Sequence, residues 1–494
     1  MNAVISKCLR DLLPEVDEHL ATLAVTGLVV DSRQVRPGDL FLAFPGETQD
    51  GRDHIPHAIS AGAALIIAEA GVGPVAGAVP VVEVKGLRAR VSAIAGRFFD
   101  EPSRELRVIG VTGTNGKTSC TQLLGQALRL AGQSCGVIGT LGASLDGSVG
   151  GGSLTTPDPV ALQAQLSAWR DREVANVAME VSSHGLVQGR VNGVDFHGAV
   201  FTNLSRDHLD YHGDMVSYGR AKKLLFERPG LAFAVLNEDD PFAAELARDL
   251  RERRLLRVVT FGTSAHADVH AVAVEYTASG MQFELSVDGE RTAMSSQLLG
   301  PFNLSNLLAV IAVLRELGLD LATIAALVPR LKPIAGRMER VPVDSEIDVV
   351  VDYAHTPDAL AQALRALRGH CHGRLWCVFG CGGDRDQGKR PLMGRVAETE
   401  ADVVVLTSDN PRGEAPDQIL AQIAAGMSRN AVTLADRAAA IDYAVAEAQP
   451  GDVILLAGKG HEAYQLIDGQ RRPFSDSAAA RAALLARKQR GASA

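Results

Sequence analysis

Residues 106–119 read Leu-Arg-Val-Ile-Gly-Val-Thr-Gly-Thr-Asn-Gly-Lys-Thr-Ser. An apolar run leads into a glycine-rich turn that ends in a lysine and a hydroxyl residue, a pattern typical of a buried strand, a phosphate-binding loop and a helix. Backbone N–H groups at a helix N-terminus carry partial positive charge and can hold phosphate oxygens. We expect Lys117 to reach the outer phosphates of a nucleotide and the Thr118 hydroxyl to bind Mg²⁺.

This loop departs from the standard pattern at one position. A standard phosphate loop has a glycine five residues before Gly116. This chain has Val111 there and places glycines at 110 and 113 instead. An ordinary strand-to-helix turn is therefore the alternative interpretation. Because the lysine and the threonine keep their register between a strand and a helix, we interpret the segment as a phosphate loop.

Short apolar runs alternate with helical patterns on both sides of this loop. Up to Ser103, runs such as GLVVDSR, DLFLAF and VPVVEV indicate a small α/β domain. After the loop, the runs CGVIGT, VANVAMEVSS, FHGAVFTNL and LAFAVLN predict a mostly parallel sheet with helices on both faces. Residues 267–297 alternate with period two, which predicts an antiparallel insert. The predicted fold class is α/β.

Near Gly336 a new series of alternating apolar and polar segments begins, with four units that each contain a strand followed by a loop. They contain IDVVVDYAHTPD, RLWCVFGCGGDRD, ADVVVLTSDNPR and DVILLAGKGHE. Ligands of open parallel sheets bind outside the carboxyl ends of the strands, so we expect the polar residues of these units to share one edge. We predict three domains, at residues 1–103, 104–337 and 338–494.

Composition narrows the classes of partner. The net charge of -9 does not favour nucleic acid. The six cysteines form no CxxC pair, which predicts free thiols in a reducing compartment. The first residues lack the apolar core of a signal peptide, and no apolar run is long enough to span a membrane. We expect a cytoplasmic protein without membrane insertion.

Two polar residues after apolar strands are candidate metal ligands. Glu180 ends VANVAME, and His208 lies in NLSRDHLDYH. Both suit Mg²⁺ beside a nucleotide. The alternative is that they are loop residues that cap helices, with Asp207 as one such cap. Zinc sites among 208–212 or 370–381 are disfavoured, because the spacing of their histidines and cysteines fits zinc poorly.

The chain resembles the Mur ligase family. The segments TGTNGKTS, MEVSSHGL, NLSRDHLDYHG, AKKLLF, GPFNLSNLLA, GRMERV, DYAHTPD, GCGGDRDQGKRPLMG, DNPR and GKGHE appear in the family's order over almost the whole chain. The resemblance implies a UDP-binding domain, an ATP-binding domain and a Rossmann-like domain for the amino acid. It implies an ATP- and Mg²⁺-dependent ligase that adds meso-diaminopimelate to UDP-N-acetylmuramoyl-L-alanyl-D-glutamate through an acyl phosphate. We expect small-molecule substrates and a monomer.

The resemblance also implies roles for individual residues. ATP contacts are expected from Gly113, Thr114, Asn115, Gly116, Lys117, Thr118, Ser119, Asn303, Asn306, Arg337, Asp352 and His355. Contacts with the UDP-muramoyl-peptide are expected from Ser32, Thr155, Thr156, Ser182 and Arg190. Asn306 has a simpler interpretation as a helix N-terminal cap, and Arg337 as a hinge residue.

Lys222 corresponds to a carbamylated lysine of the family, and Lys223 is the neighbouring alternative. With Thr118, Glu180 and His208 it would hold Mg²⁺, so Lys117, Lys222, His208 and Glu180 form the expected catalytic set.

The loop Asp409-Asn-Pro-Arg412 is expected to select the amino acid. Pro411 fixes its own φ and presents Arg412 rigidly, and a guanidinium matches a carboxylate with two parallel hydrogen bonds. Meso-diaminopimelate differs from lysine by one distal carboxylate, so this loop would distinguish the two. The resemblance completes the pocket with Arg385, Asp409, Asn410, Pro411, Gly458 and Glu462, with Glu462 binding the distal amine. The alternatives are a lysine-adding relative, a folylpolyglutamate synthetase, an NTPase without a ligation product, and a non-enzymatic nucleotide-binding module that binds ATP without releasing phosphate.

Overall fold

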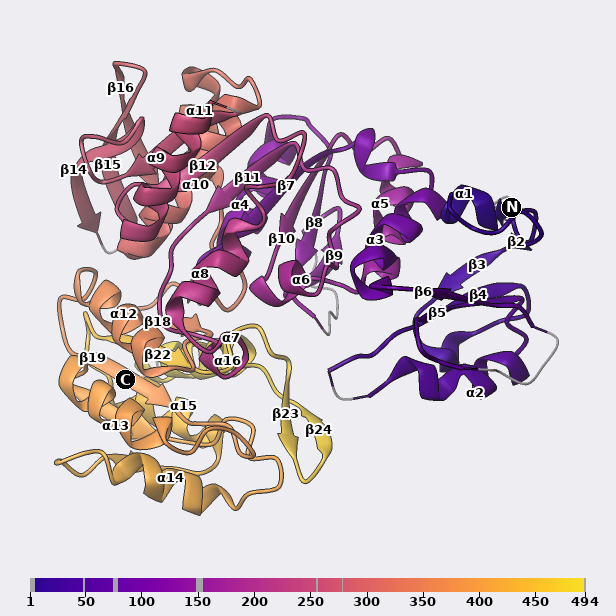
Figure 1. The fold of residues 1–494 in the computed structure, drawn as a ribbon. Helices are drawn as coiled ribbons and strands as arrows, with labels where there is room; N and C mark the ends of the chain where they lie inside the picture. The colour runs from indigo at the N-terminus through magenta and orange to yellow at the C-terminus, as the bar shows by residue number, and fades with distance from the viewer. Residues whose placement is uncertain are drawn as a thin grey trace. The chain divides into compact units, whose positions relative to one another are not determined.

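The computed structural model describes residues 5–47, 49–73, 79–147, 154–254, 256–277 and 279–492. Its contacts divide the chain into two compact units. Unit 1 comprises residues 1–270 and 308–320, and unit 2 comprises residues 271–307 and 321–494. Figure 1 shows the elements of each unit in chain order. The three predicted domain boundaries stay predictions.

The first part of unit 1 is a four-stranded parallel sheet with both faces covered. Alternate residues of its strands enter two separate cores, as Leu40 and Phe41 do. Helix α3 covers the first core and helix α2 the second. Because both faces are buried, the strand sequences are nearly continuous runs of apolar residues. The sheet order is β3 (Gly27–Val29), β4 (Asp39–Ala43), β5 (Leu65–Glu69), β6 (Val81–Val84), with β1 (Lys7–Cys8), α1 (Leu9–Leu12), β2 (Ala24–Val25), α2 (Ile55–Ser60) and α3 (Leu87–Phe98) around it.

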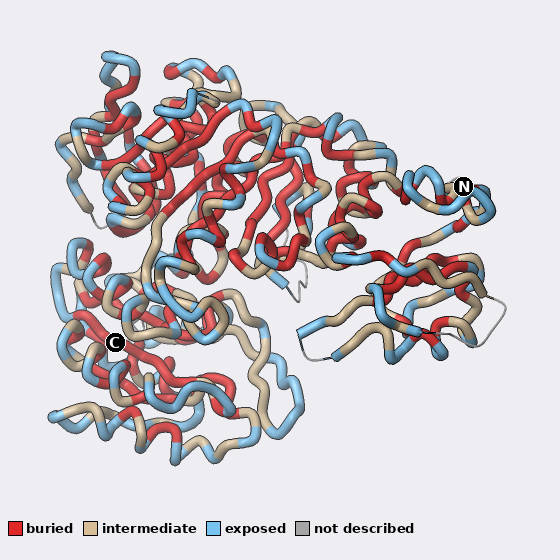
Figure 2. The backbone as a smooth tube through the Cα atoms, viewed as in Figure 1, coloured by how far each residue is buried: buried red, intermediate tan, exposed pale blue. Residues whose placement is uncertain are grey.

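The larger sheet of unit 1 is mostly parallel, as predicted. Its strands run in the order β13-β12-β11-β7-β10-β8, so β7 is central, and Figure 2 shows this sheet as almost entirely buried. The bounds are β7 (Arg107–Thr112), α4 (Lys117–Leu130), β8 (Cys135–Gly139), β9 (Gly142–Ser144), α5 (Pro159–Arg170), β10 (Asn176–Glu180), α6 (Ser183–Val187), β11 (Gly198–Phe201), α7 (Leu209–His212), α8 (Met215–Lys223), β12 (Phe233–Asn237), α9 (Pro241–Arg253) and β13 (Arg257–Gly262).

The unusual glycine pattern of the phosphate loop follows from this packing. Gly110 and Val111 both lie inside β7. A Cβ on Gly110 would stand 2.9 Å from a ring carbon of Phe196. The glycine at 110 therefore lets the Phe196 ring, from the segment before β11, approach the strand, and Val111 is an ordinary buried strand residue.

Unit 2 contains a doubly wound sheet in the order β17-β18-β22-β19-β20-β21. Its core on one face includes α12, α13 and α14, and the core on the other includes α15 and α16. The strands are β17 (Glu339–Arg340), β18 (Asp348–Asp352), β19 (Leu375–Phe379), β20 (Val403–Leu406), β21 (Val432–Thr433) and β22 (Val453–Ala457), and the helices are α12 (Pro357–Arg368), α13 (Lys389–Glu400), α14 (Pro416–Ala424), α15 (Arg437–Glu447) and α16 (Asp476–Ala492).

Four parallel strands of this sheet, β18, β22, β19 and β20, end at the same edge, as the sequence predicted. The predicted insert contains an antiparallel hairpin that pairs Met281 with Ser296. The other elements here are β14 (Val269–Thr277), β15 (Gly280–Val287), β16 (Glu290–Ser296), α10 (Pro301–Glu316), α11 (Leu321–Leu327), β23 (Tyr464–Ile467) and β24 (Gln470–Pro473).

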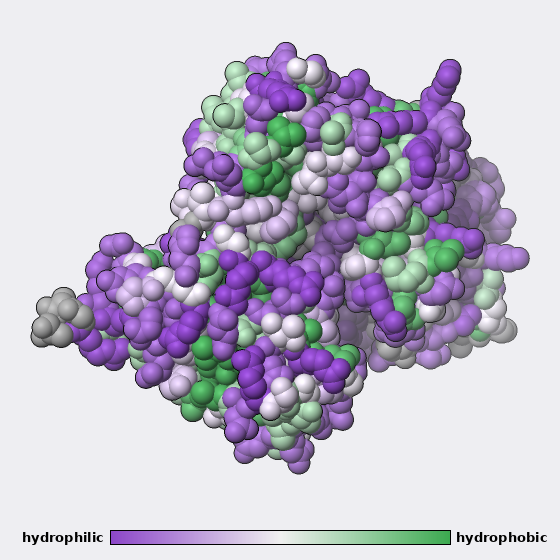
Figure 3. Space-filling view, turned by 90° about the vertical axis from the view of Figure 1, so that its left-hand side faces the viewer, coloured by the Kyte–Doolittle hydropathy of each residue, from purple (hydrophilic) through white to green (hydrophobic). Residues whose placement is uncertain are grey.

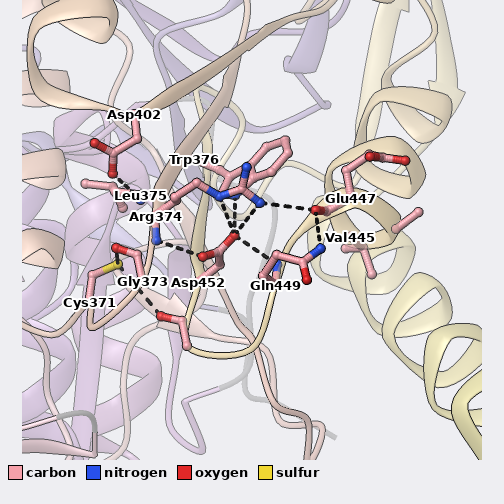
Figure 4. A network of polar contacts seen from close by, with 12 residues as sticks. Cys371, Gly373, Arg374, Leu375, Trp376, Asp402, Val445, Glu447, Gln449 and Asp452 are labelled. Atoms are coloured by element: carbon pink, nitrogen blue, oxygen red, sulfur yellow. Dashed lines mark hydrogen bonds and ion pairs between the residues drawn. The ribbon is translucent and has the colours of Figure 1, made fainter.

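The opposite edge of the unit 2 sheet is braced by one carboxylate. Asp452, just before β22, accepts hydrogen bonds from Arg374 N at 2.7 Å, Trp376 Nε1 at 2.9 Å and Gln449 N at 2.9 Å (Figure 4). These bonds fix the starts of β19 and β22 relative to each other. Internal hydrogen bonds to Asp452 thus hold the amino edge of the sheet, and the loops with the predicted site residues lie at the carboxyl edge.

No helix within the described ranges is long and apolar enough to cross a membrane. Figure 3 shows a mostly hydrophilic face in which hydrophobic residues form small separate patches.

Candidate active site

The phosphate loop lies between β7 and α4 and is held by the segment that follows β11. Gly113 and Gly116 have φ values of 144° and 85°, a conformation that favours glycine. Asn115 N donates to Asn203 Oδ1 at 3.0 Å, and Thr202 Oγ1 donates to Asn115 O at 2.6 Å. The loop is therefore shaped before any ligand binds, with Thr118 and Ser119 buried in the first turn of α4.

Two lysines converge on one carbonyl oxygen of this loop. Lys117 Nζ donates to Gly113 O at 2.9 Å and to Thr114 O at 2.7 Å, and Lys222 Nζ donates to the same Gly113 O at 2.7 Å. Lys222 is buried, and its ammonium lies 4.3 Å from the centre of the Tyr218 ring. Burial and the nearby Lys117 charge hold the pKa of Lys222 well below its ordinary value. The structure thus brings together the two lysines that the sequence singled out.

Glu180 ends β10 beside the strand that leads into the loop, in register with Val111. Its carboxylate is buried and accepts hydrogen bonds from Thr140 N at 2.9 Å and Thr140 Oγ1 at 3.2 Å. The alternative interpretation of Glu180 as a helix cap is therefore wrong. The carboxylate of Glu180 and the hydroxyl of Thr118 are the oxygen donors that Mg²⁺ prefers, so these residues fit that ion.

His208 is more exposed than the other predicted metal ligands. Its side chain is 48% exposed, its φ is 52°, and its Nε2 lies 3.4 Å from Asp207 Oδ2. Asp207 does not cap a helix, because His208 itself precedes α7 and Asp207 accepts only the His208 backbone N–H there. Within the described residues no group of three His, Cys, Asp or Glu side chains is placed to hold a metal, so neither zinc site is supported.

The predicted muramoyl-peptide residues of the large sheet form one network around Thr156. Ser182 N donates to Thr156 Oγ1 at 2.9 Å, and Thr156 Oγ1 donates to Glu180 O at 3.0 Å. Arg190 Nη1 donates to Thr156 O at 2.8 Å. Thr155 Oγ1 is 3.1 Å from Thr140 Oγ1. Ser32 lies apart from this network, in the short 3-10 helix Ser32–Gln34.

In unit 2 the Arg412 loop follows β20 and is held by the hairpin β23–β24. Arg412 has a φ of 53°. Its N donates to Leu466 O at 2.9 Å, and Asp468 N donates to its carbonyl at 2.8 Å. Its guanidinium Nη1 donates to Gly383 O at 2.9 Å. The backbone of this loop is therefore fixed from two other strand ends.

Three further side chains of the predicted pocket surround a lysine that the sequence analysis did not select. Lys459 Nζ lies 3.0 Å from Glu462 Oε2, 3.3 Å from Asn410 Oδ1 and 3.8 Å from Asp409 Oδ1. Asn410 Nδ2 donates to Glu462 Oε2 at 2.8 Å. Burial raises the pKa of Asp409. Lys459 stands within the GKGHE segment, so its position directly after an apolar strand was the available clue.

Gly458 and Arg385 have different places in this pocket. A Cβ on Gly458, whose φ is 110°, would stand 2.7 Å from Asp409 Oδ2, so the glycine makes room for that carboxylate. Arg385 is exposed, and its Nη1 lies 3.5 Å from Asp384 O. The structure therefore joins Asp409, Asn410, Glu462 and the Gly458 turn, and leaves the Arg385 side chain outside the network.

A fully buried ion pair, also missed from the sequence, supports the strand ends beneath this pocket. Arg437 and Asp476 are both 0% exposed, with Nη2 2.6 Å from Oδ2. Arg437 also donates to Ala457 O at 2.9 Å and to Ser408 O at 3.3 Å. The pair thereby ties the end of β22 to the segment that leads into the Arg412 loop.

The predicted nucleotide residues of unit 2 fall into two groups. Asn303 and Asn306 are buried on α10, with Asn306 Nδ2 3.2 Å from Asn303 Oδ1. Asn306 lies within the helix, so its interpretation as an N-terminal cap is wrong.

The second group lies around the ring of Tyr353. The Arg337 guanidinium lies 4.8 Å from the centre of that ring, and its buried Nε has no hydrogen-bond partner among the described residues. Asp352 accepts from Met338 N at 2.8 Å, and His355 Nδ1 lies 2.9 Å from Tyr353 O. The ring of Tyr353 lies 5.5 Å from that of His461, next to the amino-acid pocket.

Comparison with known proteins identifies the family. Residues 24–99 match the family model described as Mur ligase family, catalytic domain, residues 111–314 match the Mur ligase middle domain, and residues 336–460 match the Mur ligase, glutamate ligase domain. The chain belongs to the Mur ligase family.

Relatives within this family are similar over nearly their whole length. The UDP-N-acetylmuramoyl-L-alanyl-D-glutamate--2,6-diaminopimelate ligase of Ectopseudomonas mendocina (strain ymp) is 51% identical over 482 residues, 97% of this chain and 98% of that protein. Its Pseudomonas aeruginosa counterpart is 50% identical over 483 residues, again 97% and 98%. A solved structure of a ligase with the same name has a TM-score of 0.74 at 37% identity and covers 98% of this Mur ligase and 99% of that chain.

Proposed function

We propose that this chain is an ATP-dependent ligase that joins meso-2,6-diaminopimelate to UDP-N-acetylmuramoyl-L-alanyl-D-glutamate. The names of its relatives and the Asn410–Arg412 pocket support this assignment. Residues 1–103 would bind the uridine nucleotide, residues 104–337 ATP, and residues 338–494 the amino acid. We place the monomeric enzyme in the cytoplasm, because its free cysteines suit a reducing compartment and its substrates are nucleotides.

The first step activates the carboxylate of the dipeptide. A carboxylate oxygen attacks the γ-phosphorus of ATP, ADP leaves, and an acyl phosphate forms. Two anions must approach each other in this step, so positive charge in the phosphate loop lowers the barrier. Lys117 stands at that position and would exchange its two loop carbonyls for phosphate oxygens.

Mg²⁺ would be held by Thr118, Glu180, His208 and a carbamylated Lys222, and when bound it would neutralise charge on the transferring phosphoryl group. The depressed pKa of Lys222 supports this, because only the neutral amine reacts with CO₂. The amine nitrogen bonds to the carbon of CO₂ and loses a proton, which leaves an anionic oxygen ligand.

The second step forms the amide. The neutral amine of the incoming amino acid attacks the acyl carbon, the nitrogen loses a proton to solvent, and phosphate leaves from the tetrahedral intermediate. The distal end of diaminopimelate carries a carboxylate and an ammonium. Arg412 would bind the first and Glu462 the second, and a buried polar pocket of this kind rejects substrates that leave its groups unpaired.

The observation that carries the assignment is the arginine loop locked beside a carboxylate and an amide at the strand ends of unit 2. The test is phosphate release with ATP, the UDP-muramoyl dipeptide and a panel of amino acids. Release that requires all three substrates and is greatest with meso-diaminopimelate is expected. Release without an amino acid would indicate an NTPase, and a preference for lysine would indicate the lysine-adding class.

A further inference from the structure

Lys459 is a buried cation that the proposed mechanism does not use. It follows β22 between Gly458 and Gly460, and its side chain is 0% exposed. Lysine is almost never fully buried unless it is paired, because desolvation of an ammonium costs much free energy. The contacts of Lys459 therefore show what keeps it in place.

Its partners are the side chains that would contact the amino acid. The ammonium lies 3.0 Å from Glu462 Oε2, 3.3 Å from Asn410 Oδ1 and 3.8 Å from Asp409 Oδ1. An ammonium has three donors in a fixed tetrahedral arrangement. Lys459 thus holds groups from two separate loops at defined positions around one centre.

The amide of Asn410 can have only one orientation in this network. Its Oδ1 faces two donors, Lys459 Nζ at 3.3 Å and Leu466 N at 2.9 Å, while its Nδ2 faces the Glu462 carboxylate at 2.8 Å. A flipped amide would place its NH₂ group against both donors and its oxygen against the carboxylate. Lys459 is therefore one of the three groups that select this orientation, together with Leu466 N and the Glu462 carboxylate.

The carboxylate of Glu462 has one oxygen that is available to bind a ligand. Oε2 is shared by Lys459 and Asn410, whereas Oε1 has no hydrogen-bond partner in the described part of the chain. The Glu462 side chain is 20% exposed, so the carboxylate is not sealed inside the protein as Lys459 is. An ammonium of a ligand would find a carboxylate whose position is already fixed.

We propose that Lys459 is a positioning residue for selection of the distal amine: it fixes the Asn410 amide and the Glu462 carboxylate so that Oε1 of Glu462 meets the ammonium of the incoming amino acid. This inference rests on the proposed function, in which Glu462 binds that amine. Without the Lys459 charge, the Glu462 carboxylate keeps only Asn410 Nδ2 of its two donors and can turn away, and Asn410 Oδ1 keeps only Leu466 N of its two.

The test compares three amino acids as substrates of the native enzyme and of Lys459→Met. Meso-diaminopimelate has both distal groups, 2-aminopimelate lacks the distal amine, and lysine lacks the distal carboxylate. The native enzyme should prefer diaminopimelate over 2-aminopimelate by about 10²-fold in kcat/KM. Lys459→Met should reduce this ratio by at least about tenfold, while the ratio of diaminopimelate to lysine, which reports Arg412, changes much less.

Two controls separate positioning from general damage. Lys488→Met removes an exposed lysine paired with Asp344 at 3.1 Å in the same unit and should leave both ratios unchanged. Lys459→Arg keeps the charge and should keep most of the preference for the distal amine. If Lys459→Met does not fold, the preference of Lys459→Arg is the measurement that tests positioning by the charge. The KM for ATP should change little in all variants.

Several results would overturn the inference. If Lys459→Met lowers all three kcat/KM values by the same factor, the lysine only stabilises the fold. If Lys459→Arg folds and loses the preference, or if neither variant folds, positioning by the charge is likewise rejected. A native enzyme that releases phosphate with no dependence on amino acid would instead reject the proposed function.

Discussion

The phosphate loop of unit 1 and the Arg412 loop of unit 2 both follow parallel strands, yet they are built differently. The phosphate loop offers main-chain N–H groups, and its glycines have φ values of 144° and 85°. The Arg412 loop offers side chains, which are held by Gly383, Leu466 and Lys459. The first kind of site would recognise any phosphate chain, whereas the second would distinguish amino acids that differ by one group.

The largest expected effect belongs to the phosphate loop. Lys117→Ala removes the charge that offsets repulsion between two anions, so kcat should fall by about 10⁴-fold. Phosphate release measures the loss. Calorimetric binding of diaminopimelate, which involves unit 2, should be retained. Near-native turnover would mean that this loop does not act on the transferring phosphoryl group.

Arg412→Ala should have the next largest effect, and only on the amino acid. The distal carboxylate would lose a bidentate partner, so kcat/KM for diaminopimelate should fall by about 10³-fold while KM for ATP stays the same. Arg412→Lys is the matched variant, and it should recover little, because an ammonium cannot bind both oxygens in parallel. Equal use of lysine and diaminopimelate by the native enzyme would contradict this role.

Lys222→Ala should lower kcat by about 10²-fold, because one oxygen ligand of Mg²⁺ would be lost. Added acetate or formate should restore part of the activity, and Lys223→Ala is the control for a site displaced by one residue. Carbamylation consumes the neutral amine and releases a proton, so a rise in pH favours it. Enzyme stripped of CO₂ should regain activity to a greater extent at pH 9 than at pH 7 when it is equilibrated with the same concentration of dissolved CO₂, and equal recovery at both would count against modification.

The smallest effect should come from the hairpin beneath the Arg412 loop. Gln465 Nε2 donates to Asp409 O at 2.9 Å. Gln465→Leu removes one hydrogen bond worth about 1 kcal/mol, so KM for diaminopimelate should rise about fivefold with no change for ATP. A variant with native KM would show that the loop keeps its position without this brace.

The two regions also differ in how far the sequence predicts them. The phosphate loop is a continuous run of residues, so strand, loop and helix could be read in order, and the alternating pattern likewise predicted the larger sheet of unit 1 and the parallel sheet of unit 2. The residues that fix that loop could not be predicted from the sequence, because they are distant along the chain: Asn203 accepts a hydrogen bond from Asn115, 88 positions away. Periodicity reports which face of an element is buried, and it carries no information on which distant loop lies against it.

The pocket of unit 2 shows this limit more strongly. Asn410 and Glu462 were predicted from family motifs, but their common partner Lys459 is 49 positions from Asn410. The ion pair between Arg437 and Asp476 spans 39 positions and has no local motif. Buried charges of this kind depend on tertiary contacts that complete their hydrogen bonds, so they appear only when the fold is known.

Close packing at Gly336 would couple the binding of nucleotide and amino acid at the sites proposed for Arg337 and Glu462. A Cβ on this glycine would stand 2.0 Å from His461 N, so the turn that carries Arg337 presses directly on the turn that carries Glu462. Ligands that displace either turn must then alter the affinity of the other site, and linkage requires both affinities to change by the same factor. The dissociation constant of ATP, measured with and without diaminopimelate, should therefore shift by the same factor as that of diaminopimelate with and without ATP. Gly336→Ala would force these two turns apart, so it should change this shared coupling free energy although neither Arg337 nor Glu462 is itself replaced.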